Sequence, residues 1–330
     1  MKIFIAPLNW GLGHATRCIP LIRYYLAQGD EVVLGGDGKS LVLLRRHFPQ
    51  LRVVDLPSLE LRYTHNHQQR GFYLRAVPAL IRFTIADHYY LRQRLAMEHF
   101  DLVISDNRFG LFTRQTRCAY ITHQLYVRLP KRLKLFEPLA RVVHACIYKR
   151  YTEVWVPDYA DRTNNLAGEL CHGGCFDNRA KYIGPLSRFS SCVTTSSTIG
   201  ARGEWFVDGV LFDKNHLSSL AILSGLEPQR TLFEQELMDR AMLTGEQMLL
   251  VQGLVDRPAT RIQRGNITLV PHLSDEALLQ AMQQATTIIA RSGYSTIMDL
   301  AVLNLLHKAE LHATPGQTEQ EYLAVLHARR

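Results

Sequence analysis

The chain has 330 residues, of which 47% are hydrophobic and 21% are charged. This composition excludes an intrinsically disordered chain, a collagen-like chain and a polytopic membrane protein, and no apolar run approaches the ~20 residues that a membrane-spanning helix needs. At roughly 150 residues per domain, the length predicts two domains.

The formal net charge of +8 is unevenly distributed, since residues 1–183 carry +11 and residues 184–330 carry −3. A basic half favours nucleic acid, an anionic membrane surface or a phosphorylated substrate as a partner, with a solvated basic surface as the alternative. Nucleic acid is disfavoured because the sequence has no recognised binding module and no array of aromatic side chains on strands. Six cysteines are too sparse for a disulfide framework, so we expect a cytoplasmic protein.

Apolar runs of strand length alternate with longer amphipathic stretches through the first half of the chain. The predicted strands are 2–8, 31–34, 52–56, 101–105, 119–122, 153–156 and 181–183. The predicted helices are 15–28, 39–47, a long one around 71–99 and one around 134–150. Strands that alternate with helices of about ten or more residues indicate βαβ units and a parallel sheet.

The same pattern restarts after a Ser- and Thr-rich stretch at 187–200, which we expect to be a linker. The predicted strands are 220–223, 248–251, 267–270, 287–290 and one within 305–312. The predicted helices are 229–243, 275–284, 295–302 and 317–328. The sequence therefore predicts an α/β protein of two Rossmann-like, doubly wound domains, 1–185 and 186–330, which face a cleft.

The first candidate site follows the first predicted strand, in the sequence NWGLGHATR. Its glycines, Gly11 and Gly13, allow a tight turn and a close approach to a ligand. It is not a dinucleotide-binding fingerprint, because Thr16 or Arg17 stands where a third small residue is needed. His14 lies at the expected helix start, where an imidazole that titrates near neutrality can act as a general base. The alternative is a histidine that only caps the loop.

The second candidate site is Asp106, which follows the predicted strand 101–105. The carboxyl ends of parallel strands meet at one edge of the sheet, so Asp106 would lie near His14. There it would orient the imidazole and stabilise its protonated form, as the acid of a catalytic triad does. A turn residue that caps the next helix is an equal alternative.

The third candidate site is ARSGYSTIMDL at 290–300, where a buried strand ends and a helix begins. Backbone amides, hydroxyls and a guanidinium would converge there on a phosphate. The residues concerned are Arg291, Ser292, Gly293, Ser295 and Thr296. Asp299 lies one turn later on the same side as Thr296 and would accept hydrogen bonds from two ribose hydroxyls. The alternative is an ordinary Ser/Thr helix cap.

Three further strand ends carry weaker signals. Glu319 and Gln320 open the last predicted helix, and adjacent carboxylate and amide groups suit recognition of vicinal sugar hydroxyls. Arg230 would neutralise a leaving diphosphate. The backbone near His272 would contact the edge of a base.

These residues together resemble the GT-B glycosyltransferases, in particular UDP-glucuronosyltransferase-like and peptidoglycan-precursor N-acetylglucosaminyltransferase-like enzymes. GLGHATR resembles the glycine-His loop of their acceptor domain, and RSGYSTIMD resembles their donor signature, His-Cys-Gly-Trp-Asn-Ser-Thr-x-Glu. In that correspondence Arg291 replaces the phosphate-contacting His, Thr296 falls on the phosphate-contacting Ser, and Asp299 falls on the ribose-binding Glu. Glu319 and Gln320 fall on the Asp-Gln pair that holds the donor sugar.

The resemblance implies transfer of a sugar from a nucleotide-diphosphate donor, UDP-linked, to a hydroxyl acceptor with inversion and without a metal ion or other cofactor. His14 would be the base, and Arg291 with the amides of 293–296 would receive the diphosphate. Two alternatives stay open. One is a sugar-nucleotide epimerase on the same fold, and the other is a non-catalytic sugar-nucleotide-binding protein.

Residues 128–141 interleave basic side chains with Leu and Phe, as in segments that lie on an anionic membrane. The alternative that we favour is an amphipathic helix packed on the sheet. The first interpretation implies peripheral contact with the inner face of the membrane and an acceptor that is lipid-linked or anionic. No metal site is expected, because Cys171-His-Gly-Gly-Cys175 lacks the second pair of ligands that zinc requires.

The end of the chain departs from the family pattern. Glu310 and His312 fall in a strand that should be buried and apolar, so this strand is either an edge or shifted in register. The chain ends at Arg330, soon after its last predicted helix. GT-B folds usually continue through a helix that crosses back to the first domain, so the resemblance implies a short or truncated second domain.

Overall fold

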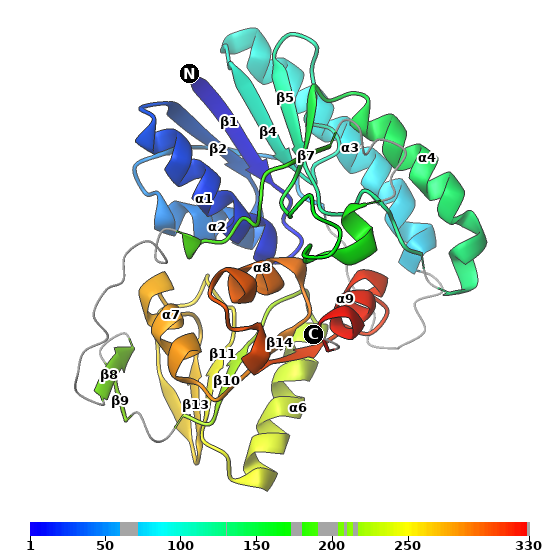
Figure 1. Cartoon of the computed structure of the whole chain (residues 1–330). Coiled ribbons are helices and arrows are strands. Elements are labelled where there is room, and N and C mark those ends of the chain that lie inside the picture. Colours follow the sequence, from blue (N-terminus) through cyan, green and yellow to red (C-terminus); the bar gives the residue numbers. More distant parts are fainter. Residues whose placement is uncertain are drawn as a thin grey trace.

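The structure is a computed structural model that describes residues 1–59, 72–129, 131–172, 180–190, 204–207, 210–213 and 217–328. Most of the predicted linker, 191–200, and the last three residues of the Cys-His-Gly-Gly-Cys segment, 173–175, lie outside the described residues. The two domains each contain one sheet flanked by helices (Figure 1).

The sheet of the first domain has seven strands in the order β3-β2-β1-β4-β5-β6-β7, and all its neighbours pair in parallel. The central strands β1 and β4 are buried along almost their whole length, which explains why they are near-continuous apolar runs in the sequence. The strands are β1 (Lys2–Pro7), β2 (Glu31–Gly36), β3 (Arg52–Asp55), β4 (Leu102–Asp106), β5 (Arg117–Ile121), β6 (Glu153–Val156) and β7 (Ala180–Tyr182).

Helices connect most of these strands, as the alternating pattern predicts. They are α1 (Gly13–Ala27), α2 (Gly38–His47), α3 (Phe72–Met97), η1 (Lys131–Phe136), α4 (Glu137–Tyr148) and η2 (Gly168–Cys171). The predicted helix 134–150 is divided, since a 3₁₀ turn, η1, precedes α4. A proline in the first turn of α4 fits this boundary, because proline is tolerated where no amide donor is needed.

The sheet of the second domain has six strands in the order β12-β13-β11-β10-β14-β15, all parallel except β12. The strands are β10 (Ser219–Ile222), β11 (Met248–Val251), β12 (Ile262–Arg264), β13 (Ile267–Val270), β14 (Thr287–Arg291) and β15 (Ala309–His312). The helices are α6 (Gln229–Thr244), α7 (Asp275–Gln284), α8 (Tyr294–Val302), η4 (Leu306–Lys308) and α9 (Thr318–Ala328).

Three short strands were not predicted. β12 is fully exposed and pairs antiparallel with the edge of the sheet, so its three residues carry no apolar alternation. The strands β8 (Glu204–Val207) and β9 (Val210–Asp213) form a separate two-stranded hairpin. Strands of three or four residues are at the short end of the usual range, so they leave a weak sequence signal.

β15 is an edge strand, as one of the two interpretations of its charged residues expects. Glu310 is only partly buried, and its carboxylate accepts hydrogen bonds from Arg240, at 2.6 Å, and from His312, at 2.8 Å. No unpaired charge is therefore buried at Glu310.

The two domains are packed against one another through the carboxyl ends of their sheets. Tyr294, Ile297 and Met298 of α8 and Leu323 of α9 belong to the same hydrophobic cluster as the core of the first sheet. Figure 1 shows α8 and α9 directly below the first domain. Among the described helices, none has the length and apolar character to cross a bilayer.

Candidate active site

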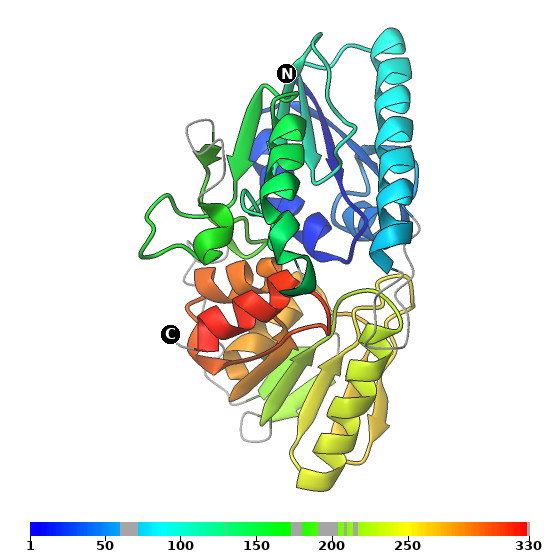
Figure 2. The same ribbon diagram turned by 90° about the vertical axis from the view of Figure 1, so that its right-hand side faces the viewer.

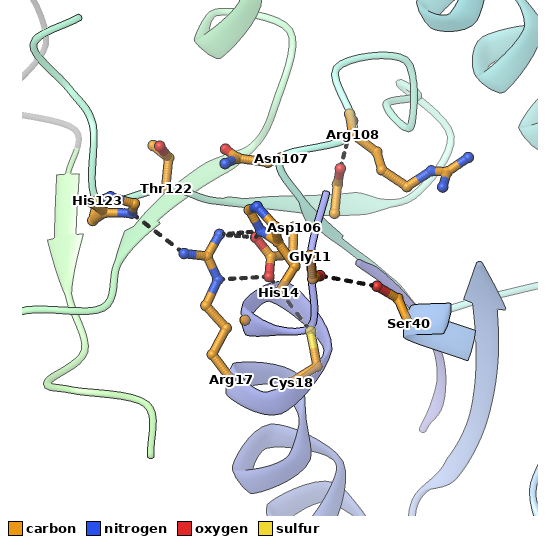
Figure 3. A network of polar contacts seen from close by, with 12 residues as sticks. Gly11, His14, Arg17, Cys18, Ser40, Asp106, Asn107, Arg108, Thr122 and His123 are labelled. Atoms are coloured by element: carbon orange, nitrogen blue, oxygen red, sulfur yellow. Dashed lines mark hydrogen bonds and ion pairs between the residues drawn. The ribbon is translucent and has the colours of Figure 1, made fainter. Parts of the chain in front are cut away.

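His14, Arg17 and Asp106 form a buried cluster at the carboxyl end of β1 (Figure 3). His14 is the second residue of α1, and Asp106 is the last residue of β4, which pairs with β1 so that Asp106 lies opposite Pro7. This register brings two residues 92 positions apart to one point, where His14 Nδ1 lies 3.1 Å from Asp106 Oδ1. The predicted His-Asp pair is thus present in the structure.

Arg17 adds a positive charge that the sequence analysis did not place in the site. Its Nε donates to Asp106 Oδ2 at 2.6 Å, and its Nη2 donates to Asp106 Oδ1. Its Nη2 also lies 2.9 Å from His14 Nδ1. The spacing explains the contact, because Arg17 follows His14 by three residues on α1 and therefore lies on the same face.

The electrostatics of this cluster favour an ionised Asp106 beside a neutral His14. Burial raises the pKa of Asp106, but the positive charge of Arg17 and the hydrogen bonds from Arg17 and His14 outweigh burial and lower that pKa to about 2. Burial lowers the pKa of His14, against the opposing effect of Asp106. If Nδ1–H donates to Asp106, the lone pair on Nε2 is free to accept a proton, which is what a general base requires.

A second group of polar residues connects this cluster to the other domain. His123, just after β5, lies 3.3 Å from Arg17 Nη1 through its Nδ1 and 2.6 Å from Glu319 Oε1 through its Nε2. Gln124 also donates to Glu319. Burial raises the pKa of Glu319, but its contacts with His123 and the nearby His14 and Arg17 lower that pKa overall. Glu319, predicted to hold the donor sugar, is thus bonded to the first domain here.

The helix α8 begins close to the cluster of His14, Arg17 and Asp106. The ring of Tyr294 stacks on His123 at 4.1 Å between centroids and 11° between planes, and its hydroxyl donates to the carbonyl of Pro157 at 2.8 Å. A Cβ added to Gly13 would overlap Ser295 Oγ. The first turns of α1 and α8 are therefore in contact.

The glycine loops of the two domains also meet. Gly11 has a φ of +86° and Gly225 a φ of +104°, both in the left-handed region that favours glycine. A Cβ added to Gly11 would lie 3.8 Å from the Cα of Gly225. The loop after β1 thus faces the loop after β10, as expected for two doubly wound domains with opposed switch points.

Two residues of the predicted donor motif, Ser292 and Arg291, have protein partners. Ser292 is buried and donates to the carbonyl of Gln320 at 2.8 Å. Gly293 caps α8, and Thr296 lies half-buried in its first turn. The guanidinium of Arg291 is buried, donates to the carbonyl of Ala313 at 2.8 Å and lies 3.8 Å from the Phe233 ring.

The side chains of Asp299 and Gln320 are bonded to other protein groups. The carboxylate of Asp299 accepts from Ser187 Oγ at 2.6 Å and forms a salt bridge with Arg188, so it binds the segment that follows the first domain. Burial raises its pKa. The Gln320 side chain accepts a hydrogen bond from the Thr314 amide at 2.8 Å, which joins the two ends of the segment 314–320. Ribose or sugar binding by these groups would replace bonds that already exist.

Arg230 and His272 lie at other strand ends of the second domain. Arg230 is buried and paired with Glu227, at 2.6 Å, and Glu234, at 2.5 Å, so its charge is already neutralised. His272 Nε2 lies 2.7 Å from a guanidinium nitrogen of Arg46 on α2, which makes it a contact across the domains.

Three residues that complete this site were missed. The sequence singles out Arg17 only as a misfit in a dinucleotide fingerprint, gives the Tyr294 side chain no role within the 290–300 motif, and does not single out His123. A usable signal existed for His123, because it directly follows a predicted strand, as Asp106 does. Across the described part of the chain, no group of three or more His, Cys, Asp or Glu side chains is arranged to hold a metal ion.

Comparison with solved structures identifies the fold. No protein-family model and no curated protein sequence matches the chain. Among solved structures, the calicheamicin glycosyltransferase CalG4 superposes with a TM-score of 0.58 at 11% identity, over 99% of this chain and 83% of that one. The chain has the GT-B fold.

Two other glycosyltransferase structures also superpose on this chain. SnogD from Streptomyces nogalater has a TM-score of 0.54 at 14% identity, over 99% of this chain and 94% of that one. UGT2 of Phytolacca americana, complexed with UDP-2fluoro-glucose and pterostilbene, has a TM-score of 0.53 at 15% identity, over 98% of this chain and 82% of that one. The expected architecture of two Rossmann-like domains, GT-B in type, is confirmed.

Proposed function

We propose that this GT-B chain transfers a hexose from a UDP-linked donor to a hydroxyl acceptor, with inversion and without a metal ion. The observation that supports this most is the contact between the first turns of α1 and α8 beside His14. Each helix amino end carries partial positive charge and amides with no partner inside the helix. Two such ends meeting at one point favour an anion between them, and the leaving diphosphate supplies one.

The proposed reaction is a single displacement. The acceptor oxygen attacks the anomeric carbon, the bond from that carbon to the diphosphate oxygen breaks, and His14 Nε2 takes the acceptor's proton. Attack from the face opposite the leaving group inverts the anomeric configuration. Asp106 stabilises the resulting imidazolium, and Arg17 keeps Asp106 ionised.

The departing diphosphate would be stabilised by the amides at the start of α8. Preorganised donors of this kind contribute roughly 3 kcal/mol each to the transition state. Ser295 and Thr296 add hydroxyl donors on the same turn. With Arg230 already paired to two glutamates, these amides and hydroxyls are the groups that we assign to the leaving group.

Glu319 would bind the donor sugar after leaving His123. Both partners are near the base His14, since His123 also contacts Arg17. A sugar hydroxyl can replace the imidazole as a donor to the Glu319 carboxylate. We therefore propose that donor binding exchanges this contact between domains for a contact with the sugar.

The acceptor that we propose is a lipid-linked or anionic hydroxyl compound at the cytoplasmic face of a membrane. The excess of positive charge in residues 1–183 supports this choice, because it attracts anionic surfaces and substrates.

The test begins with donor binding by the full chain. UDP, dTDP and GDP sugars are each added at saturating concentration and the melting temperature is measured, since a ligand of the folded state raises it by mass action. We expect UDP-sugars to give the largest increase. Absence of any increase with all three nucleotide classes contradicts the proposal.

The second stage follows the bound sugar nucleotide during incubation with and without a panel of hydroxyl acceptors. Release of UDP that depends on an acceptor supports transfer. Conversion of one UDP-sugar into its epimer indicates an epimerase instead. Binding without any turnover across the panel indicates a sugar-nucleotide-binding protein.

A further inference from the structure

Asn107 directly follows the acid Asp106 and has a rare backbone conformation. Its φ is +57°, in the left-handed region that favours glycine, and among the described residues Asn304 is the only other non-glycine residue with a positive φ. Asparagine tolerates this region better than most residues, and residues in sparsely populated regions cluster at functional sites. The proposed reaction uses His14 and Asp106 but leaves the Asn107 side chain without a role.

The residues on both sides of Asn107 are held in place by buried bonds. Asp106 is fixed by its two-point ion pair with Arg17. The carbonyl of Arg108 accepts from the Tyr151 hydroxyl at 2.8 Å, and its guanidinium is fully buried. That guanidinium donates to three groups at 2.7–2.8 Å, which are Asp87 of α3, Asp37 before α2 and the Pro57 carbonyl. The backbone at Asn107 therefore cannot change its conformation without breaking bonds on either side.

A buried tyrosine sets the direction of the Asn107 side-chain amide. The hydroxyl of Tyr120 on β5 donates to Asn107 Oδ1 at 2.9 Å, and Tyr120 is fully buried. Its ring packs on those of Tyr148 and Tyr151, at 5.4 and 4.9 Å between centroids, which fixes the hydroxyl. The oxygen and nitrogen of an amide lie on opposite branches of one plane, so Nδ2 points away from Tyr120. Asn107 is partly exposed, and within the described part of the chain its Nδ2 donates to no group.

This side-chain amide lies at the edge of the first sheet that faces the second domain. β4 ends at Asp106, and Figures 1 and 2 show the second domain below that edge. Asp106 contacts His14 at 3.1 Å, and consecutive Cα atoms are ~3.8 Å apart, so Asn107 is within reach of a molecule bound at His14. In Figure 3 the Arg108 guanidinium points away from this cluster, while the Asn107 amide stays beside it.

We propose that Asn107 binds the acceptor through a second oxygen beside the hydroxyl that reacts. His14 takes the proton of one hydroxyl, and Asn107 Nδ2–H donates to the neighbouring oxygen. The site therefore prefers acceptors with vicinal oxygens, as in a sugar or a polyol, since such oxygens accept hydrogen bonds. This rests on the proposed function and deepens it, because it specifies the chemical class of the acceptor.

The contacts of Asn107 are not those of an ordinary turn residue. In a turn, an asparagine side chain typically bonds its own backbone two residues further on. Asn107 Oδ1 instead accepts from Tyr120, which is 13 positions later and on another strand. The oxygen is thus used to orient the amide, and the N–H donors are left for a ligand.

The test is ligand-observed NMR of the full chain saturated with UDP. The two matched probes are the trans vicinal diol of cyclohexane and cyclohexanol, which differ only in the second oxygen. We expect the diol to bind about three- to tenfold more tightly, the contribution of one neutral hydrogen bond. Equal affinity of the wild-type chain for the two probes overturns the proposal.

Two variants separate the side-chain amide from the backbone. Asn107→Gly keeps the positive φ and removes the amide, and Asn107→Asp keeps an oxygen for Tyr120 but has no N–H donor. Both should lose the preference for the diol and bind cyclohexanol as the wild type does. The matched control is Asn304→Gly, because Asn304 has a φ of +56° but is exposed beyond α8 in the other domain. A diol preference that survives in either Asn107 variant, or is lost in the control, contradicts the assignment.

Two further readouts keep this result distinct from misfolding and from the proposed function. The melting temperature and UDP affinity of Asn107→Gly should equal those of the wild type, because glycine adopts the same backbone conformation. Loss of UDP binding in that variant would indicate a structural role and overturn the proposal. Since the NMR experiment measures binding, a wild-type chain that prefers the diol but transfers no sugar supports the role of Asn107 and contradicts only the transfer.

Discussion

Arg17 and Asp106 form a two-point ion pair inside the first domain. Arg17 Nε lies 2.6 Å from one carboxylate oxygen, and Arg17 Nη2 donates to the other. The Arg17 side chain is only 3% exposed and that of Asp106 is fully buried. The pair fixes the acid beside His14 and holds its negative charge in place.

Substitution of Arg17 should therefore destabilise the fold as well as the site. Arg17→Ala leaves a buried carboxylate without its cation, and we expect the free energy of unfolding to fall by about 3 kcal/mol. Arg17→Lys should recover part of this loss, because an ammonium supplies the charge but not the two-point geometry. Urea unfolding measures the free energy of unfolding of both variants. The control is Arg264→Ala, because Arg264 is exposed.

His14 should control turnover and its pH dependence. His14→Gln should lower kcat by about 10²- to 10⁴-fold with little change in UDP affinity, as expected for loss of a general base. Burial lowers the pKa of His14, so the base is neutral at pH 7 and activity should fall only as the pH drops below the ordinary histidine value of 6.5. A pH profile with its acidic limb above that value contradicts the assignment.

Glu319 should affect donor binding directly, after its contact with His123 is exchanged for one with the sugar. Glu319→Gln removes the charge that sugar hydroxyls would bind, and we expect the donor KM to rise about tenfold, the effect of one charged hydrogen bond. Glu321→Gln, an exposed residue on the same helix, is the matched control and should leave KM unchanged. Steady-state kinetics at varied donor concentration measures the donor KM of both variants.

Asp299 can stabilise the fold through Ser187, bind ribose, or do both. Variants of Asp299 and of Ser187 distinguish these roles. Both Ser187→Ala and Asp299→Asn disrupt their 2.6 Å hydrogen bond and should lower the free energy of unfolding by about 1 kcal/mol or more. Only Asp299→Asn should weaken UDP binding, if its carboxylate binds ribose. Equal UDP affinity in the two variants, measured by calorimetry, would restrict Asp299 to a structural role.

The contact between Gly13 and Ser295 can be tested by a double-mutant cycle. Gly13→Ala introduces a methyl group that overlaps Ser295 Oγ, so it should separate α1 from α8 and weaken UDP binding. Ser295→Gly in the same chain removes the obstructing atoms and should restore part of the affinity. Additive effects of the two substitutions would show that the helices do not meet here.

Much of the fold was predictable because its sheets are parallel and buried. Strands covered on both faces appear as short apolar runs, so β6, β11 and β13 were predicted at their observed bounds. The exposed strand β12 was not predicted, since it buries no apolar face that would leave a period in the sequence. The short hairpin β8–β9 was not predicted either. The His14–Asp106 pair was predictable from two adjacent strand ends.

The sequence by itself determined the residue types at the strand ends, and with them the glycine loop and the proposed base His14 and acid Asp106. Tertiary structure alone decided which charges are already paired. Arg230 binds Glu227 and Glu234, Asp299 binds Ser187, and Glu319 reaches His123 of the other domain. Side-chain partners distant in sequence are set by domain packing and by the rotamers that it permits, and no local pattern records them.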